Sequence, residues 1–343
     1  MKLKIFTAFL LLGLAGAVPP GRNPRDVTII TKKYFSESFV KYTAQHDIVN
    51  LLVPLNGLNF DDLSSAIEES MKTHTTSEDI RKVTVFFAEA DIDASGKRTY
   101  KGLYALKDGK ARRILENGRD ASASVDDNKV VFLAASDGVY VFDGEDRSVQ
   151  KYGSITDSII GIAKESEGEL LYILTEDNSV YKVTDNGNKK EKLEDVNDAQ
   201  QIKLDNDGNL FFYTPDKKVH VRTSEGVKTI DSLPENPSDI VLVNCPVVLE
   251  EGLTILVDRD LYIVYKNGTS IFYGLEFAPD FMPTAFGPDA TLFQYYAYDK
   301  KIYEFNVIEL LSEEESKRKN NVGDSADGLL KFVSEKQKQR NKV

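Results

Sequence analysis

The chain has 343 residues, of which 41% are hydrophobic and 29% charged, and its formal net charge is −12. A chain of this length can bury a large core without disulfide bonds, and the excess of acidic residues argues against nucleic acid or an anionic membrane surface as a partner. Cys245 is the only cysteine, so no disulfide can form within the chain, and its apolar neighbours predict a buried, inert thiol.

The N-terminus has the order of a secretory signal. Lys2 and Lys4 precede an apolar run from Ile5 to Leu14, and small residues follow up to Ala17. This order predicts a signal peptide over residues 1–17. The run is too short to span a bilayer, and no later stretch approaches the ~20 apolar residues of a membrane helix. We therefore expect a secreted, extracellular protein with no membrane span; an uncleaved N-terminal anchor is the alternative.

A unit of about 40 residues recurs six times between Val83 and Leu311. Its clearest element is an apolar residue followed by a ring residue, with steps of 36, 41, 39, 42 and 41 residues between copies: Leu103-Tyr104, Val139-Tyr140, Val180-Tyr181, Val219-His220, Leu261-Tyr262 and Ile302-Tyr303. An apolar, aromatic strand lies about ten residues before each copy. The short turns between the two strands are rich in Asp, Asn and Gly, which indicates hairpins.

Each unit also predicts an inner strand of small residues and a polar outer strand. The inner strands are expected at Ala123–Asp126, Gly161–Lys164, Ile202–Asp205 and Ala285–Gly287, and the outer strands at Ala111–Leu115, Val149–Tyr152, Lys190–Leu193, Val227–Ile230 and Ser270–Tyr273. Four antiparallel strands in about 40 residues are typical of a propeller blade. The period-2 alternation excludes a helical solenoid. We predict an all-β, six-bladed β-propeller over residues 18–311.

The last unit lacks an outer strand, because charged residues follow its tyrosine strand from Glu309 to Lys319. A propeller closes its ring by borrowing a strand from the other terminus, and Val27–Thr31 is the expected donor. Asp47–Val53 then supplies the inner strand of the first blade, which a capped helix over about residues 61–81 interrupts. Residues 312–343 are expected to form a charged, mostly disordered tail.

No catalytic motif stands out. The three histidines have no partner at metal-ligand spacing, and the chain has no glycine-rich phosphate loop and no nucleophile elbow. His220 occupies the repeated tyrosine position, which predicts a half-buried structural ring. We therefore expect a protein that is not an enzyme and that uses no cofactor.

Aspartates recur just ahead of the inner strands: Asp47, Asp120, Asp157, Asp198, Asp239 and Asp280. The blade topology would gather them at one mouth of the channel. They could organise the loops by accepting backbone amides, or form an acidic rim that attracts a cation or ligand donors. Phe281, Met282 and Phe286 lie beside this rim in sequence, and an apolar wall with a few polar groups suits a small-molecule site. These three side chains could equally fill the channel.

The unit resembles a known superfamily. An inner strand such as Gly161-Ile162-Ala163, the turn over residues 205–209 and a strand such as Val180-Tyr181-Lys182-Val183 are similar to the six-bladed propellers that include gluconolactonase-like and royal-jelly-like proteins. With its signal peptide, short Tyr-rich blades and no tryptophan, the chain more narrowly resembles the insect ommochrome-binding proteins, secreted haemolymph carriers of a tryptophan-derived pigment. The long N-terminal segment, residues 61–81 and the charged tail depart from that family, and no pigment-binding residue carries over.

The leading functional prediction is a secreted, non-enzymatic carrier of a small hydrophobic or aromatic, pigment-like ligand at the channel mouth. A protein-binding scaffold is one alternative. A metal-dependent hydrolase of the gluconolactonase kind is another, although such a site needs Glu and Asn ligands besides Asp. Asn267-Gly268-Thr269 is the only glycosylation sequon that proline does not exclude, and it lies in a predicted hairpin loop, so we also expect a glycoprotein.

Overall fold

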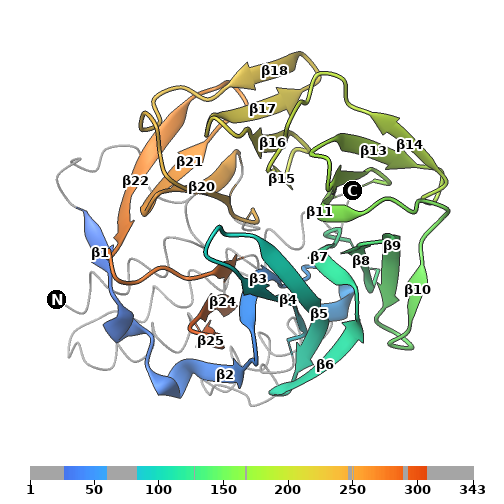
Figure 1. Ribbon diagram of the computed structural model, residues 1–343, viewed down its shortest axis with the longest axis horizontal. Coiled ribbons are helices and arrows are strands. Elements are labelled where there is room, and N and C mark those ends of the chain that lie inside the picture. The colour runs from blue at the N-terminus through green and yellow to red at the C-terminus, as the bar shows by residue number, and fades with distance from the viewer. Residues whose placement is uncertain are drawn as a thin grey trace, which may run out of the picture.

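The structure is a computed structural model that describes residues 27–59, 83–126, 128–166, 168–245, 249, 251–288 and 293–306. Its strands form six separate sheets, which stand as blades around a central channel (Figure 1). The fold is therefore the all-β, six-bladed propeller that the repeat predicts. Among these described residues helix is scarce: two single 3-10 turns, η1 (Lys32–Tyr34) and η2 (Glu37–Phe39), and the helical residues 57–59 in the first blade.

Within each blade the strands follow one another outward as antiparallel neighbours. Blades 1 to 3 are β3 (Asp47–Leu52), β4 (Val85–Ile92), β5 (Arg98–Lys107), β6 (Lys110–Leu115); β7 (Gly118–Ser122), β8 (Val130–Ala135), β9 (Gly138–Asp143), β10 (Val149–Lys151); and β11 (Ile159–Lys164), β12 (Leu171–Thr175), β13 (Val180–Thr184), β14 (Lys189–Lys192). Blades 4 to 6 are β15 (Gln201–Leu204), β16 (Leu210–Tyr213), β17 (Val219–Thr223), β18 (Gly226–Thr229); β19 (Ile240–Leu242), β20 (Leu253–Val257), β21 (Asp260–Val264), β22 (Ser270–Phe277); and β23 (Ala285–Gly287), β24 (Phe293–Tyr298), β25 (Lys301–Asn306).

The burial pattern explains which strand of a blade lies inside. Every residue of β12 and of β20 is buried, because each blade packs between two others and its second strand has no free face. Every residue of the outer strand β14 is exposed and charged. Apolar clusters fill the spaces between blades, as where Phe211 of blade 4 packs with Leu253 and Ile255 of blade 5.

Side chains, rather than a shared backbone ladder, join the inner strands of neighbouring blades. Asn50 Nδ2 donates to the Arg119 carbonyl (2.8 Å) and so links blade 1 to blade 2. Gln201 makes two bonds to the Leu242 backbone, at 3.1 and 2.8 Å, between blades 4 and 5. The Thr284 hydroxyl donates to the Ile48 carbonyl (2.6 Å) between blades 6 and 1. These bonds satisfy backbone groups on the inner edges that would otherwise lack a partner.

The prediction of which strand closes the last blade is wrong. A strand does form within Val27–Thr31, but this strand, β1 (Thr28–Ile30), pairs in parallel with β22 of blade 5. The strand that completes the last blade is β2 (Val40–Thr43), antiparallel to β25. The N-terminal segment thus adds one strand to each of two neighbouring blades, and Figure 1 shows it running in blue along the outside of both.

Two contacts hold this segment against the ring. Phe35 lies between β1 and β2 and packs on the rings of Phe281, Tyr303 and Phe305, with centroid separations of 4.6, 5.0 and 5.2 Å. Lys41 of β2 pairs with Glu304 (3.0 Å), whose second carboxylate oxygen accepts the hydroxyl of buried Tyr295 (2.6 Å). Burial, followed by the charge of Glu304, raises the pKa of Tyr295 well above its ordinary value.

Other expectations are met in part. The inner strand of blade 2 is β7, which ends just before the expected Ala123–Asp126, whereas β3, β11, β15 and β23 overlap their predicted spans. The predicted signal peptide over residues 1–17, the predicted helix over about residues 61–81 and the predicted tail over residues 312–343 lie outside the described residues. Within the described ranges, no helix is long and apolar enough to cross a membrane.

His220 is half-buried at the repeated ring position of β17, as predicted. Its ring stacks on Phe212 at 5.1 Å, and its two nitrogens lie 3.3 Å from the Thr214 hydroxyl and 3.1 Å from the Thr229 hydroxyl. Burial lowers the pKa of His220. The imidazole therefore adopts the neutral form more readily in the folded chain than in the unfolded chain.

The first prediction concerns the aromatic anchor of the N-terminal segment. Phe35→Ala should lower the free energy of unfolding by about 3–5 kcal/mol, because it removes a buried ring from a packed cluster. Ile29→Ala in β1 is the control, since Ile29 is 51% exposed; we expect a change within about 0.5 kcal/mol. Urea denaturation measures both, and equal losses would contradict the anchoring role of Phe35.

The second prediction concerns His220. As pH falls below about 6.5, the unfolded histidine takes up a proton that the folded one resists. The wild type should therefore lose stability from that pH down to the lowered folded pKa of His220. His220→Tyr restores the residue found at the other five positions, and it should flatten this part of the stability curve. Melting temperatures between pH 5 and 8 test this; an unchanged slope would contradict it.

Candidate functional site

The channel has two mouths. The inner strands begin at one end, here called the first mouth, and end at the other, the second mouth. A cavity of about 590 Å³ opens at the first mouth. Residues from all six blades line it, including Asn50, Lys97, Arg98, Tyr100, Arg119, Asp120, Gly161, Glu176, Gln200, Gln201, Lys203, Tyr213, Asp239, Val241, Asn244, Thr284 and Phe286.

The hairpin between β4 and β5 covers part of this mouth. These two strands are longer than most others in the propeller, and Figure 1 shows their teal hairpin lying across the middle of the ring. Asp93 fixes the turn, because its carboxylate accepts the amides of Ser95 (2.8 Å) and Lys97 (3.0 Å). The hairpin thereby places Lys97 and Arg98 over the cavity.

Charges of both signs surround the cavity. Arg119 Nη1 lies 3.1 Å from the Ser158 hydroxyl and 3.5 Å from Glu176 Oε2, and its guanidinium stands 5.4 Å from the ring centre of Tyr100. The hydrogen bond from Ser158 and then the charge of Arg119 hold the pKa of Glu176 below its ordinary value. The mouth is therefore not the purely acidic rim that the recurring aspartates suggest.

Tyr213 brings a phenol to the same cavity from blade 4. Burial, followed by the negative charge of Asp239, raises its pKa, while the charge of Arg98 lowers it. Tyr213 therefore stays protonated at neutral pH and can donate a hydrogen bond.

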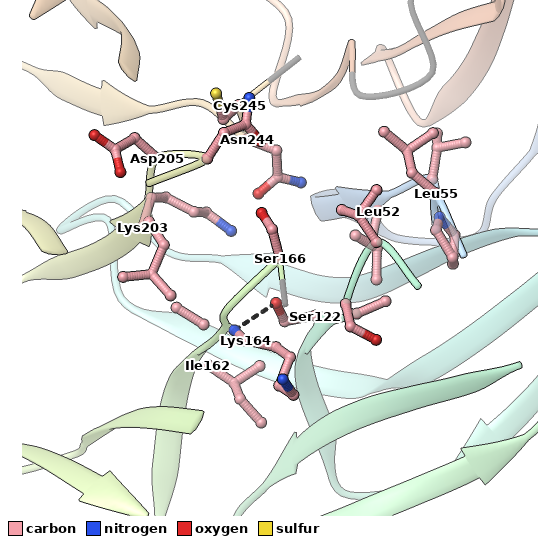
Figure 2. Close-up of a pocket in the computed structure, with 18 residues that line it drawn as sticks. Leu52, Leu55, Ser122, Ile162, Lys164, Ser166, Lys203, Asp205, Asn244 and Cys245 are labelled. Carbon is pink, nitrogen blue, oxygen red and sulfur yellow. Dashed lines mark hydrogen bonds between the residues drawn. The ribbon is translucent and has the colours of Figure 1, made fainter. Parts of the chain in front are cut away.

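A smaller cavity of about 80 Å³ lies at the second mouth (Figure 2). The Lys164 ammonium there donates to the carbonyl of Gly168 (2.6 Å), and burial lowers its pKa. Asp205 is 2% exposed, and burial raises its pKa although it accepts the amides of Asp207 and Asn209. Lys203 lines both cavities and so lies where they approach each other along the channel.

The six recurring aspartates differ in their burial and in the groups that they contact. Asp120, 6% exposed within β7, accepts the amides of Ala121 (2.9 Å) and Ile162 (3.1 Å), so it links blades 2 and 3. Asp239 is exposed and lines the first-mouth cavity. The other four are not among the residues that line that cavity. Asp47 starts β3, Asp157 pairs with Lys190 (2.5 Å), and Asp198 and Asp280 are exposed in loops.

The three predicted apolar rim residues also lie in different places. Phe286 lines the first-mouth cavity. Phe281 is 1% exposed and packs against Phe35, and Met282 packs against the same aromatic cluster, away from the described lining of the cavity. The structure thus brings together Asp120, Asp239 and Phe286 of the nine predicted rim residues. Across the described ranges, no group of three or more His, Cys, Asp or Glu side chains is placed to hold a metal ion.

Sequence reasoning missed the basic residues of the site. Lys203 had a detectable signal, because it alternates with the apolar residues Ile202 and Leu204 in an inner strand and must face the other way. Lys97 and Arg98 had none, since only the length and direction of the β4–β5 hairpin bring them over the channel.

No protein-family model and no curated protein matches the sequence. Similar solved structures include PorZ, described as an essential bacterial surface component of the type-IX secretion system of Porphyromonas gingivalis (12% identity, TM-score 0.45, 77% of this chain and 38% of that one). Another is the RRP9 WD40 repeats (14% identity, TM-score 0.47, 75% of each chain). A third is the extracellular domain of a one component system from B. thetaiotaomicron (11% identity, TM-score 0.43, 65% and 32%). The chain thus spans well under two thirds of PorZ.

The third prediction separates the two interpretations of the aspartates. Asp120→Ala should lower the free energy of unfolding by about 1–3 kcal/mol, because two buried amides lose their acceptor. Asp239→Asn should change it by no more than about 0.5 kcal/mol, because that carboxylate is exposed. Urea denaturation of both variants measures the difference. A loss in Asp239→Asn as large as that in Asp120→Ala would show that both aspartates organise the loops.

Proposed function

We propose that this protein is a secreted, non-enzymatic binding protein that carries a small, partly aromatic ligand in the first-mouth cavity. The observation that carries the proposal is the cavity itself. Its volume of about 590 Å³ falls within the roughly 300–1,000 Å³ range of small-molecule sites. A ligand there would be enclosed by the inner strands and partly covered by the β4–β5 hairpin.

The lining suits such a ligand. Tyr100, Tyr213 and Phe286 offer rings from three blades, and Ile160 and Val241 add aliphatic surface. Amide groups of Asn50 and Gln200 stand among them. The rest of the lining is mostly polar and charged, so these rings can stack on a planar ligand while the polar groups around them fix its orientation.

The same lining favours a carrier over the hydrolase alternative. No histidine or cysteine is among the described residues of the first-mouth cavity. Glu176 is engaged with Arg119 and Ser158, and Asp120 with two backbone amides. Asp239 is left as a single carboxylate, whereas a divalent cation needs several oxygen ligands at one point.

The glycosylation sequon supports secretion. Asn267 is exposed in the turn between β21 and β22, where its side-chain oxygen accepts the Thr269 amide (3.0 Å) and hydroxyl (2.8 Å). A sequon on an exposed turn is open to modification in the secretory pathway, which agrees with the predicted signal peptide. A pigment as ligand and haemolymph as location follow from the family resemblance alone.

The fourth prediction concerns a substitution that fills the first-mouth cavity. Val241 is half-buried and lines the first mouth, so Val241→Trp should place an indole where the ligand binds. Ile271→Trp on the outer strand of the same blade is the matched control, because Ile271 is 49% exposed. Native mass spectrometry and absorption spectra of protein purified from its source, or reloaded with an extract of that source, should show a bound compound in the wild type and in Ile271→Trp only.

Equal loading of Val241→Trp and the wild type would place the ligand elsewhere. A wild type that carries no small molecule and takes none from the extract would contradict the carrier function and favour the protein-binding scaffold. Melting curves show whether Val241→Trp remains folded.

A further inference from the structure

Lys203 directs an ammonium group into the channel. Its neighbours in β15, Ile202 and Leu204, are 1% and 9% exposed and pack between blades. Because successive side chains of a strand point to opposite sides, Lys203 points away from the blade 3 interface that these two residues fill, and it lines both channel cavities. Figure 2 shows it pointing into the second-mouth cavity from blade 4, as Asn244 does from blade 5, and both residues also line the first-mouth cavity.

This ammonium has no counter-ion within the described residues. Of the carboxylates that line the same two cavities, Asp205 accepts the amides of Asp207 and Asn209, Asp120 accepts those of Ala121 and Ile162, and Glu176 contacts Arg119 and Ser158. Asp239 alone among them has no such side-chain contact with a described residue. Asn244 donates its amide to the Leu51 carbonyl (3.1 Å), which leaves its oxygen toward the channel. An anion from outside would give this ammonium the partner that the described residues do not supply.

The rim adds positive charge. Lys97 and Arg98 lie over the cavity, and neither makes an ion pair with a described residue. Asp239 is the one lining carboxylate whose side chain has no hydrogen bond or ion pair among those residues. The formal net charge of the chain is −12, so a locally positive mouth stands out from the rest of the surface and would steer anions into the channel.

We infer that the ligand of the first-mouth cavity is an organic anion whose acidic group binds beside Lys203. Its ring system then lies between Phe286 and Tyr213, toward the mouth. This inference rests on the proposed function and narrows it to one ligand class. An inorganic anion has the same charge, but it would fill only a small part of about 590 Å³ and would leave the rings of the lining without a contact.

The test uses a charge series on one ring: naphthalene-2-carboxylate, its neutral carboxamide and 2-naphthylmethylammonium, with inorganic phosphate as a fourth probe. Titration calorimetry measures each affinity at low and at physiological salt. The carboxylate should bind at least about tenfold tighter than the carboxamide, as expected for charge-assisted hydrogen bonds, and its affinity should fall with salt. The ammonium and phosphate should bind weakly or not at all.

Variants of Lys203 test whether this residue causes the preference for the carboxylate. Lys203→Met keeps an unbranched apolar stem and removes the charged end group, so it should weaken carboxylate binding about tenfold or more while leaving carboxamide binding unchanged. Lys203→Arg should keep most of the carboxylate affinity. Lys192→Met, in the exposed outer strand of blade 3, is the control and should change nothing. Lys203→Met should melt no lower than the wild type, because it breaks no ion pair.

Three outcomes would overturn the inference: equal affinity for the three naphthalene compounds, an unchanged carboxylate affinity in Lys203→Met, or no carboxylate binding by the wild type. Phosphate binding as tight as that of the carboxylate would assign the site to an inorganic anion instead. None of these results tests the proposed carrier function, because the mass spectrum of the natural complex tests that function separately.

Discussion

The arrangement of the inner strands is the constraint on which the rest of this propeller depends. Six sheets converge on one axis, and their inner edges cannot pair with one another as strands do within a sheet. Polar side chains therefore bridge the edges, as Asn50, Asp120 and Gln201 do. Because these bridging groups stand on the channel side, the wall of the channel is polar wherever the ring is held together. Amide groups that line the cavity therefore belong to the same residues that join the blades.

The ring is closed by strand pairing and apolar packing in addition to polar side chains. An N-terminal segment completes the last two blades, because it contributes β1 to blade 5 and β2 to blade 6 before the chain continues into β3 of blade 1. Between them, Phe35 enters an aromatic cluster shared by the last two blades and this segment, and Glu304 joins β2 to the buried Tyr295. The seam is thus fixed by apolar packing and by one buried polar network, in addition to the backbone ladder.

The fold could be predicted because the same apolar and aromatic pattern returns six times, and a period of about 40 residues leaves few alternatives. The closing strand could not, because Thr28–Ile30 and Val40–Thr43 both suit an edge strand and neither pattern names its partner. Most of the recurring aspartates lie at the entry to an inner strand as predicted, but Asp120 lies within β7. Position along the chain also does not tell whether a carboxylate meets an amide, as in Asp120, or solvent, as in Asp239. Lys203 could have been found from alternation alone, whereas Lys97 and Arg98 depend on how far one hairpin reaches.

The pairing of the N-terminal segment also sets the order in which the ring can form. Thr28 pairs with Leu275 and Val40 with Tyr303, so these contacts join residues about 250 positions apart. Blades 2, 3 and 4 are each built from consecutive strands and can form as soon as their own residues are available. The last two sheets remain incomplete until nearly the whole chain is present. Long-range pairing is slow and leaves strand edges open to other chains, so the final closure step is where this protein is most exposed to misassembly during its synthesis.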